Sequence, residues 1–303
     1  MSTLIVGSGF VGRAVAAHLL RSGEKAVLAS RTPPSDDTGS RPPWSALDVT
    51  DPTAVRRVID ATNAERIVLV HGPSDVTWCE EHPEESLRGH AGAARVVAEA
   101  ADDRRIVLIS TDNVFDGTDR APDETTPPRP ANAYGRAKLA AEQVLAERGA
   151  ATTVLRVSLI YGWEPAVAPK WLNFFSSCVH RLRAGEHITA PTDQWTTPVL
   201  VEDVAAVTAA VLPGPAPALL HLGGPERISR ADWARLIARG LGLPPDRVTG
   251  QPRALGRYAS RPENSCLAST LLTTHPATAG VPVRGAHDGT RLLLTRAELA
   301  TAL

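Results

Sequence analysis

A tyrosine and a lysine lie four positions apart in the segment Tyr134-Gly135-Arg136-Ala137-Lys138. Side chains at this spacing share one face of a helix. A phenol has a pKa of about 10 and is a weak acid at neutral pH. A neighbouring ammonium stabilises the phenolate and makes the phenol a better proton donor. The pair therefore indicates general-acid catalysis, in which Tyr134 protonates a carbonyl oxygen; the alternative is an incidental pair on a surface helix.

A hydroxyl group is expected beside this pair. Ser110-Thr111-Asp112 directly follows an apolar strand predicted over 106–109. Ligands of parallel sheets bind at the carboxyl ends of the strands. We therefore expect a hydroxyl of this segment to bind the oxygen that Tyr134 protonates.

A glycine-rich turn stands near the start of the chain, in Gly7-Ser8-Gly9-Phe10-Val11-Gly12. It follows a short apolar strand and opens a helix, which is the context in which such a motif binds a dinucleotide. The glycines permit the tight turn, and the helix N-terminus offers N–H groups to the pyrophosphate. The turn residues predicted to contact a dinucleotide cofactor are Gly7, Gly9, Phe10, Val11 and Gly12.

Ser30 and Arg31 end the second predicted strand, where many NAD-binding chains carry an acidic residue for the ribose 2′-hydroxyl. The planar guanidinium of an arginine suits a 2′-phosphate instead. These residues therefore favour NADPH, with NADH kept as the alternative cofactor; the structural alternative is that Arg31 is a solvated loop residue. Arg13, just after the last glycine of the turn, is a second candidate to assist in binding the 2′-phosphate.

Apolar strands alternate with helical patterns through the first half of the chain. Strands are predicted over 3–6, 26–29, 66–70, 106–109 and 153–157, and helices over 11–20, 52–61, 84–101 and 134–148. The segment 32–43 is rich in Pro, Ser, Asp and Gly and predicts an exposed loop. Strands separated by helices indicate parallel βαβ units, so we predict an α/β fold with a doubly wound parallel (Rossmann) sheet.

The pattern changes after Tyr161. Helices are predicted near 172–184, 202–212 and 230–241, and Thr295 to Glu298 predicts the start of a final helix. We therefore divide the chain into a dinucleotide-binding Rossmann domain, 1–160 plus about 199–213, and a smaller C-terminal substrate-binding lobe, about 161–198 and 214–303. The substrate-binding residues predicted in this lobe are Asn173, Gln194 and Arg261, because their side chains offer hydrogen-bond donors and positive charge.

Composition narrows the class of protein. The chain has 303 residues, 43% hydrophobic and 21% charged, and its formal net charge of -1 gives no general attraction to nucleic acid or an anionic membrane. No apolar run approaches the ~18 residues of a membrane span. The cysteines Cys79, Cys178 and Cys266 are far apart, which argues against a disulfide framework and a zinc site. We expect a cytoplasmic protein that binds a small molecule and no metal.

Ordered motifs extend along most of the chain. They are the glycine turn, the tyrosine–lysine pair, Leu47-Asp48-Val49-Thr50-Asp51, Asp75-Val76-x-x-Cys79-Glu80-Glu81-x-Pro83, Ser110-Thr111-Asp112-Asn113-Val114-Phe115-Asp116-Gly117 and Arg261-Pro262-x-Asn264-Ser265-x-Leu267. With them the chain resembles the extended short-chain dehydrogenases/reductases, and most of all their dTDP-4-dehydrorhamnose reductase branch.

The resemblance implies a role for each matching residue. Tyr134 is the general acid, Lys138 holds the nicotinamide ribose and Thr111 binds the substrate carbonyl. Asp48 contacts the adenine of the cofactor, with Val49 beside it. The resemblance also implies a homodimer.

Several positions depart from the family's pattern. Val6 stands where extended members carry the first glycine, and His90 stands where relatives keep an asparagine that supports a proton relay. His90 either bridges a water or packs against its neighbours. Asp112-Asn113 replaces the Asp-Glu pair of related nucleotide-sugar 4,6-dehydratases, which argues against dehydration. These changes bear on the identity of the substrate more than on the type of reaction.

Together these observations predict an NADPH-dependent ketoreductase. It would transfer hydride to the 4-keto group of a nucleotide-activated (dTDP) 4-keto-6-deoxyhexose, in secondary-metabolite or cell-surface sugar biosynthesis. Two alternatives stay open: reduction of a ketone that carries no nucleotide, and a non-catalytic dinucleotide-binding subunit like the regulatory subunit of methionine adenosyltransferase, which this fold branch also resembles. The intact set of Thr111, Tyr134 and Lys138 argues against the second alternative.

Overall fold

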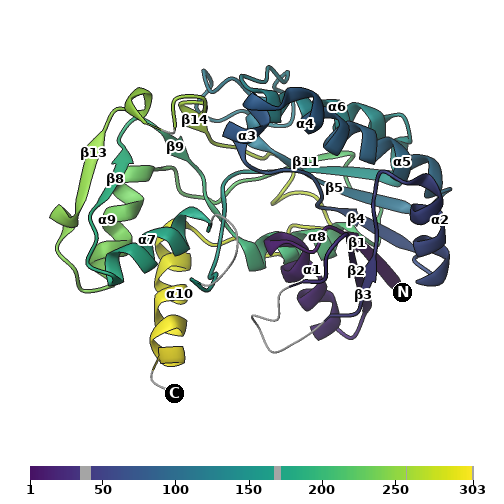
Figure 1. Ribbon diagram of the computed structural model, residues 1–303, viewed down its shortest axis with the longest axis horizontal. Helices are drawn as coiled ribbons and strands as arrows, with labels where there is room; N and C mark the ends of the chain where they lie inside the picture. Colours follow the sequence, from purple (N-terminus) through teal and green to yellow (C-terminus); the bar gives the residue numbers. More distant parts are fainter. Residues whose placement is uncertain (35–41, 167–171, 257, 302–303) are drawn as a thin grey trace.

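The computed structural model describes residues 1–34, 42–166, 172–256 and 258–301, and a seven-stranded sheet forms its centre (Figure 1). All neighbouring strands of this sheet are parallel. The predicted α/β fold with a doubly wound parallel sheet is confirmed. Residues 35–41 of the predicted loop lie outside the described residues. In spatial order the strands are β11 (Leu219–Leu222), β6 (Thr152–Val157), β5 (Arg105–Thr111), β4 (Arg66–Leu69), β1 (Ser2–Val6), β2 (Lys25–Ser30) and β3 (Trp44–Ala46).

The direction in which the chain builds the sheet reverses between β1 and β4. From β1 the chain adds β2 and β3 on one side, and then returns to add β4, β5, β6 and β11 on the other side. At such a point the connections diverge and leave a crevice at the carboxyl ends of the strands. The glycine turn after β1 and Thr111 at the end of β5 therefore lie at the same edge of the sheet.

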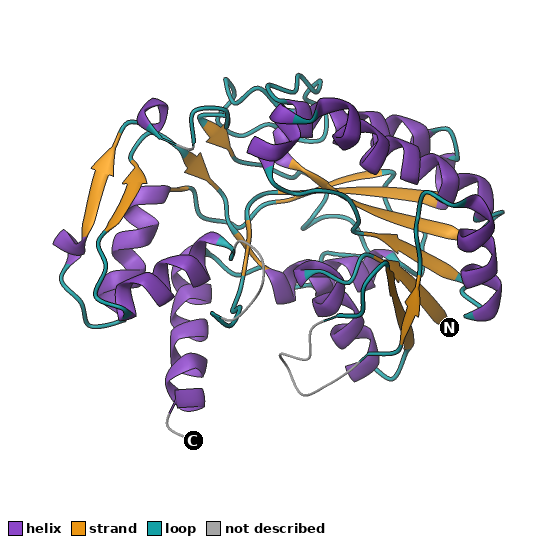
Figure 2. Ribbon diagram, in the orientation of Figure 1, coloured by secondary structure: helices purple, strands orange, loops and turns teal. Residues whose placement is uncertain are grey.

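Helices cover both faces of the sheet (Figure 2). Successive strand residues point to opposite faces, so Leu4 packs with α2, α5 and α6 on one face, and Ile5 packs with α1 and α8 on the other. None of the described helices is long and apolar enough to cross a membrane. The helices around the sheet are α1 (Phe10–Arg21), α2 (Pro52–Ala61), α5 (Ala93–Ala100), α6 (Ala133–Ala146) and α8 (Val201–Val211).

The stretch predicted as one helix over 84–101 consists of several pieces. A separate helix, α3 (Val76–Glu81), precedes it, and α4 (Pro83–Leu87) then begins with a proline at its first turn, where the missing N–H costs nothing. A π-helical turn, η1 (Arg88–Gly92), joins α4 to α5. Such turns are rare and often lie at functional sites, and this one contains the buried His90.

A smaller lobe follows, with its own core around Trp233. The indole of Trp233 is fully buried, donates a hydrogen bond to the Thr290 hydroxyl at 3.1 Å, and packs edge-on against the Tyr161 ring at 4.9 Å. The lobe's helices and strands are α7 (Phe174–Arg183), α9 (Arg230–Gly240), α10 (Ala286–Thr301), β7 (Ile160–Tyr161) with β10 (Val199–Leu200), β8 (Ile188–Pro191) with β13 (Val248–Gln251), and β9 (Trp195–Thr196) between β12 (Ile228–Ser229) and β14 (Asn264–Ser265).

Two boundaries differ from the prediction. The segment 214–303, assigned to the substrate lobe, contains β11, which pairs with β6 at the edge of the main sheet. A strand of four residues is too short to give a clear periodic signal. The final helix begins at Ala286 rather than near Thr295. Gly289 lies inside α10, where a Cβ would come within 1.8 Å of the Tyr161 hydroxyl, so the packing of α10 requires glycine at this position.

A buried ion pair fixes α6 against the sheet. Glu142 of α6 and Arg156 of β6 are 7% and 4% exposed, and Arg156 Nη2 donates to Glu142 Oε2 at 2.7 Å. Glu142 also accepts a hydrogen bond from the Ser110 hydroxyl of β5. One turn earlier, Lys138 Nζ donates to the Ile109 carbonyl oxygen at 2.9 Å. One face of α6 therefore holds consecutive residues of β5.

Replacing Glu142 with glutamine should destabilise the protein by about 3–5 kcal/mol, because it leaves the Arg156 charge buried without a counter-ion. Urea unfolding followed by circular dichroism measures this change. Glu186→Gln, which breaks the exposed pair with Arg181, is the control and should cost less than about 1 kcal/mol. Equal costs for the two variants would contradict the positioning role of Glu142.

Candidate active site

The predicted catalytic residues come together at the carboxyl end of β5. Thr111 is the last residue of that strand, and Tyr134 lies in the first turn of α6, whose N-cap Asn132 accepts a hydrogen bond from Gly135 N at 2.9 Å. The Thr111 hydroxyl lies close enough to the Tyr134 phenol to lower the pKa of that phenol. Lys138 lies one turn after Tyr134 on the same helix. Helix α6 thus carries the phenol and the ammonium on one face, beside the strand that ends at Thr111.

Burial sets the protonation states of this group. Burial raises the pKa of the Tyr134 phenol well above its ordinary value, and the nearby Asp112 carboxylate raises it further. Burial also lowers the pKa of Lys138 to about 8, against the attraction of Glu142. At neutral pH the phenol therefore carries its proton, and the ammonium is still the major form of Lys138.

Asp112 is a further buried acid that the sequence reasoning considered only as part of a dehydratase comparison. It is 5% exposed and accepts hydrogen bonds from the Asn113 amide at 2.8 Å and from the Thr111 hydroxyl at 3.2 Å. Burial raises its pKa to about 6 in spite of these donors. The only sequence signal was its position directly after Thr111.

Two buried histidines lie behind the tyrosine. The His90 ring is edge-on to the Tyr134 ring at 5.6 Å, and its Nε2 donates to the Pro73 carbonyl at 3.0 Å, which fixes the tautomer. A Cβ on Gly72 would lie 2.2 Å from His90 Cε1, so the imidazole fills the space that this glycine leaves. The structure supports the packing interpretation of His90 by these contacts.

His71 is the second histidine, and both of its ring nitrogens are buried without a hydrogen-bond partner. Burial, with a smaller contribution from the Lys138 charge, lowers the pKa of His71 to about 3 and that of His90 to about 2. Both imidazoles are therefore neutral at physiological pH. The sequence signal for His71 was its position two residues after β4, at the carboxyl edge of the sheet.

The glycine turn has the shape of a pyrophosphate cradle. Gly7 adopts a φ of +118°, and a Cβ on Gly12 would lie 1.9 Å from the Gly7 carbonyl oxygen, so both positions require glycine. Gly9, the N-cap of α1, faces open space and provides no side-chain cap, and the first turn of α1 has no acidic residue. A helix N-terminus of this shape offers N–H groups to an anion, which fits the phosphates of a dinucleotide. Phe10 and Val11 form the first turn of α1.

The predicted adenosine-binding residues lie together at the ends of β2 and β3. The Ser30 hydroxyl accepts a hydrogen bond from the Trp44 indole at 3.0 Å and donates to the Thr32 carbonyl at 2.6 Å. Arg31 is exposed and close enough to Asp48 to lower the pKa of that carboxyl, which its hydrogen bonds with Thr50 lower most. An exposed cation at this edge is compatible with a 2′-phosphate. Val49 is half-buried against the core.

The three predicted substrate residues have different surroundings. Asn173 is the N-cap of α7, and its amide already donates to the Gly162 carbonyl at 2.9 Å and to Glu164 at 2.8 Å. Gln194 is 1% exposed, and its Oε1 has no hydrogen-bond partner. Arg261 lies over the Tyr258 ring at 5.4 Å. Substrate binding by these residues stays a prediction, and Asn173 has the least capacity for it.

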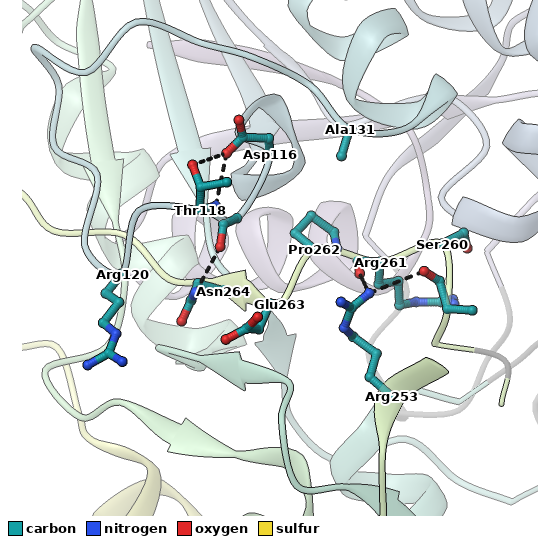
Figure 3. Close-up of a pocket in the computed structure, with 12 residues that line it drawn as sticks. Asp116, Thr118, Arg120, Ala131, Arg253, Ser260, Arg261, Pro262, Glu263 and Asn264 are labelled. Carbon is teal, nitrogen blue, oxygen red and sulfur yellow. Dashed lines mark hydrogen bonds between the residues drawn. The ribbon is translucent and has the colours of Figure 1, made fainter. Parts of the chain in front are cut away.

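A cavity of about 500 Å³ opens beside this region (Figure 3). None of the three catalytic residues lines it, although the lining residue Ala131 lies just before α6. Asn264 closes one wall by donating to the Gly117 carbonyl at 2.8 Å. Arginines surround the cavity, which gives it positive charge next to the candidate site. The lining residues with charged side chains are Asp116, Arg120, Arg253, Arg261 and Glu263.

The family follows from comparison with known proteins. The RmlD substrate binding domain matches residues 1–285. The chain belongs to the RmlD family. The resemblance drawn from the sequence motifs is therefore confirmed, and the RmlD match covers both the sheet and most of the smaller lobe.

The similar proteins include a reductase and a subunit of another enzyme. A dTDP-4-keto-6-deoxy-D-glucose reductase of Streptomyces niveus is 31% identical over 82% of this chain and 82% of its own. A methionine adenosyltransferase 2 subunit beta of Rattus norvegicus is 28% identical over 89% of this chain and 81% of its own. The fold matches the structure of a dTDP-4-dehydrorhamnose reductase from Bacillus anthracis in complex with NADP, with a TM-score of 0.80, 22% identity and coverage of 97% and 99%.

The neutral histidines should make the protein sensitive to acid. Because the pKa of His90 falls from 6.5 to about 2 on folding, only the unfolded state takes up this proton below pH 6.5, and stability is lost as the pH falls. Between pH 7 and pH 5 this amounts to about 2 kcal/mol. In His90→Asn the free energy of unfolding should fall by that much less over this range in urea titrations. The exposed His187→Asn is the control and should keep the wild-type slope; an unchanged slope in His90→Asn would contradict the assignment.

Proposed function

We propose that this chain is an NADPH-dependent ketoreductase that reduces the 4-keto group of a nucleotide-activated 4-keto-6-deoxyhexose. The observation that carries the proposal is the placement of Tyr134 near the buried Thr111 hydroxyl, one helical turn from Lys138, at the sheet edge that also carries the glycine turn. The Streptomyces niveus relative, a dTDP-4-keto-6-deoxy-D-glucose reductase, supports the substrate class. A cytoplasmic location remains a prediction from composition, and a homodimer remains a prediction from the resemblance.

Each catalytic residue has one task in this reaction. Bound NADPH supplies the hydride to the keto carbon. The Thr111 hydroxyl orients the keto oxygen, and Tyr134 gives its phenolic proton to that oxygen. The Lys138 ammonium then stabilises the phenolate, and it does so more strongly than in water because the site is buried. Tyr134 regains its proton from solvent after the product leaves.

The residues for the cofactor divide between its phosphates and its adenosine. We assign the pyrophosphate to the glycine turn and the start of α1, and the ribose 2′-phosphate to Ser30 and Arg31. Asp48 and Val49 would lie beside the adenine, and Lys138 beside the nicotinamide ribose. The NADP complex of the structurally similar Bacillus anthracis protein supports this choice of cofactor.

A non-catalytic subunit is the second candidate function, because the Rattus norvegicus relative is named as a subunit. The complete set of Thr111, Tyr134 and Lys138, gathered at the end of β5 and the start of α6, favours the enzyme. Purified protein that oxidises NADPH with a dTDP-4-keto-6-deoxyhexose, and with no added partner, would support the reductase. Tight NADPH binding without oxidation on any such sugar would support the subunit.

Replacing Tyr134 with phenylalanine removes the proton donor and keeps the ring that packs against His90. We expect kcat to fall about 10²–10⁴-fold, with the affinity for NADPH unchanged. Stopped-flow absorbance at the nicotinamide band measures the turnover, and nicotinamide fluorescence measures the affinity. Wild-type turnover in purified Tyr134→Phe protein would rule out the assigned mechanism.

Replacing Arg31 with alanine should weaken NADPH binding about 10-fold or more and leave NADH binding unchanged, because only NADPH carries the 2′-phosphate. The ratio of kcat/KM for the two cofactors is the measurement. Arg57→Ala, which removes an exposed arginine of α2, is the matched control and should leave the ratio at the wild-type value. An equal loss for both cofactors in Arg31→Ala would contradict the role.

A further inference from the structure

Arg230, the first residue of α9, is a buried cation that the protein does not pair. It is 6% exposed, and its Nε is buried with no hydrogen-bond partner. Within the described part of the chain its guanidinium donates no hydrogen bond and contacts no carboxylate. Burying an unpaired charge costs several kcal/mol, about what is needed to unfold a marginal domain. Such an arginine is therefore expected to have a partner that is absent from the chain itself.

Aromatic rings hold the guanidinium in place without neutralising it. Its Cζ lies 4.7 Å from the centre of the Phe174 ring and 5.7 Å from that of Tyr258. Arg261 lies over the same Tyr258 ring at 5.4 Å, so two guanidinium groups share one aromatic side chain. Each cation–π contact contributes about 0.5–2 kcal/mol, which is less than the several kcal/mol that burial of the charge costs. The two rings therefore hold Arg230 without supplying a negative charge that neutralises it.

The cluster faces the catalytic end of the sheet. Arg230 is attracted by the Asp112 carboxylate, which follows Thr111 directly, and repelled by Arg261. Asp112 Oδ1 accepts hydrogen bonds from the Thr111 hydroxyl and the Asn113 amide, and among the described residues no ion pair joins Asp112 to Arg230. The backbone N–H of Arg230 donates to the Gln194 carbonyl at 3.0 Å, which anchors the start of α9 beside the predicted substrate residues.

We propose that Arg230, assisted by Arg261, is an oxyanion receptor that requires the substrate to carry an anionic group, either the diphosphate of its nucleotide or a carboxylate on its sugar. This inference rests on the proposed function, because it places the ketone at Thr111 and Tyr134 and the anion on the facing lobe. The planar guanidinium fork binds two oxygens of either anion at once. Arg230 would thus exclude neutral ketones from the site.

Calorimetric titration of the full-length protein saturated with NADP+ tests the receptor without turnover. The ligands are dTDP, thymidine, dTDP-glucose and dTDP-glucuronate, titrated into wild type, Arg230→Met, Arg230→Lys and the control Arg239→Gln, an exposed arginine of the same helix. For a diphosphate partner, Arg230→Met should bind dTDP about 10- to 100-fold more weakly, with Arg230→Lys in between and thymidine unchanged. For a carboxylate partner, only dTDP-glucuronate should lose that affinity.

Two results would overturn the proposal. One is a folded Arg230→Met, with a wild-type Tm, that binds every ligand as wild type does. The other is a wild-type protein that prefers neither dTDP over thymidine nor the glucuronate over the glucose. NADP+ affinity should not change in any variant, which separates the substrate's anion from the phosphates of the cofactor. If dTDP binds through Arg230 but no 4-keto sugar is reduced, the proposed function fails and the receptor remains.

Discussion

The buried ion pair between Glu142 and Arg156 is the constraint on which the candidate site depends. Two charges in a dry interior must stay in contact, because separating them leaves each without solvent or partner. Apolar residues of similar size often replace a buried ion pair with little loss of stability, so the value of this pair lies in the position it enforces rather than in net free energy. Together with Ser110, the pair fixes the rotation of α6 about its own axis and its position along β5 and β6.

That position brings the phenol of Tyr134 and the ammonium of Lys138 to the last residue of β5. Lys138 and Glu142 lie one and two turns after Tyr134 on the same helix, so the face that is locked to the sheet is also the face that carries the chemistry. The Lys138 bond to the Ile109 carbonyl adds a second attachment on that face. Structure and proposed catalysis therefore depend on the same stripe of side chains.

Burial around this stripe has opposite consequences for different groups. It keeps Tyr134 protonated, brings the pKa of Lys138 to about 8, and keeps His71 and His90 neutral, with pKa values of about 3 and about 2. Each shift disfavours a charge, so the site holds few charges before a ligand binds. A low local dielectric also strengthens the attraction between the Lys138 ammonium and any negative oxygen formed beside it.

The sequence by itself determined the features that depend on neighbours along the chain. The glycine turn, the alternation of strands and helices, and the helical spacing of Tyr134 and Lys138 are local patterns, and their local geometry follows from backbone sterics and helix periodicity. The family motifs added the identity of Thr111 as the third member. The predicted roles of Asp48 and of the substrate residues rested on that resemblance.

Only the tertiary structure decided what depends on contacts distant in sequence. β11 joins the main sheet through pairing with β6, and the π-helical turn buries His90 against Gly72. Arg230 gives no signal in the sequence, where it is one arginine among many. Its burial between Phe174 and Tyr258 follows from how α7 and α9 pack in the lobe. Such partners are chosen by the packing of whole elements, which no local pattern specifies.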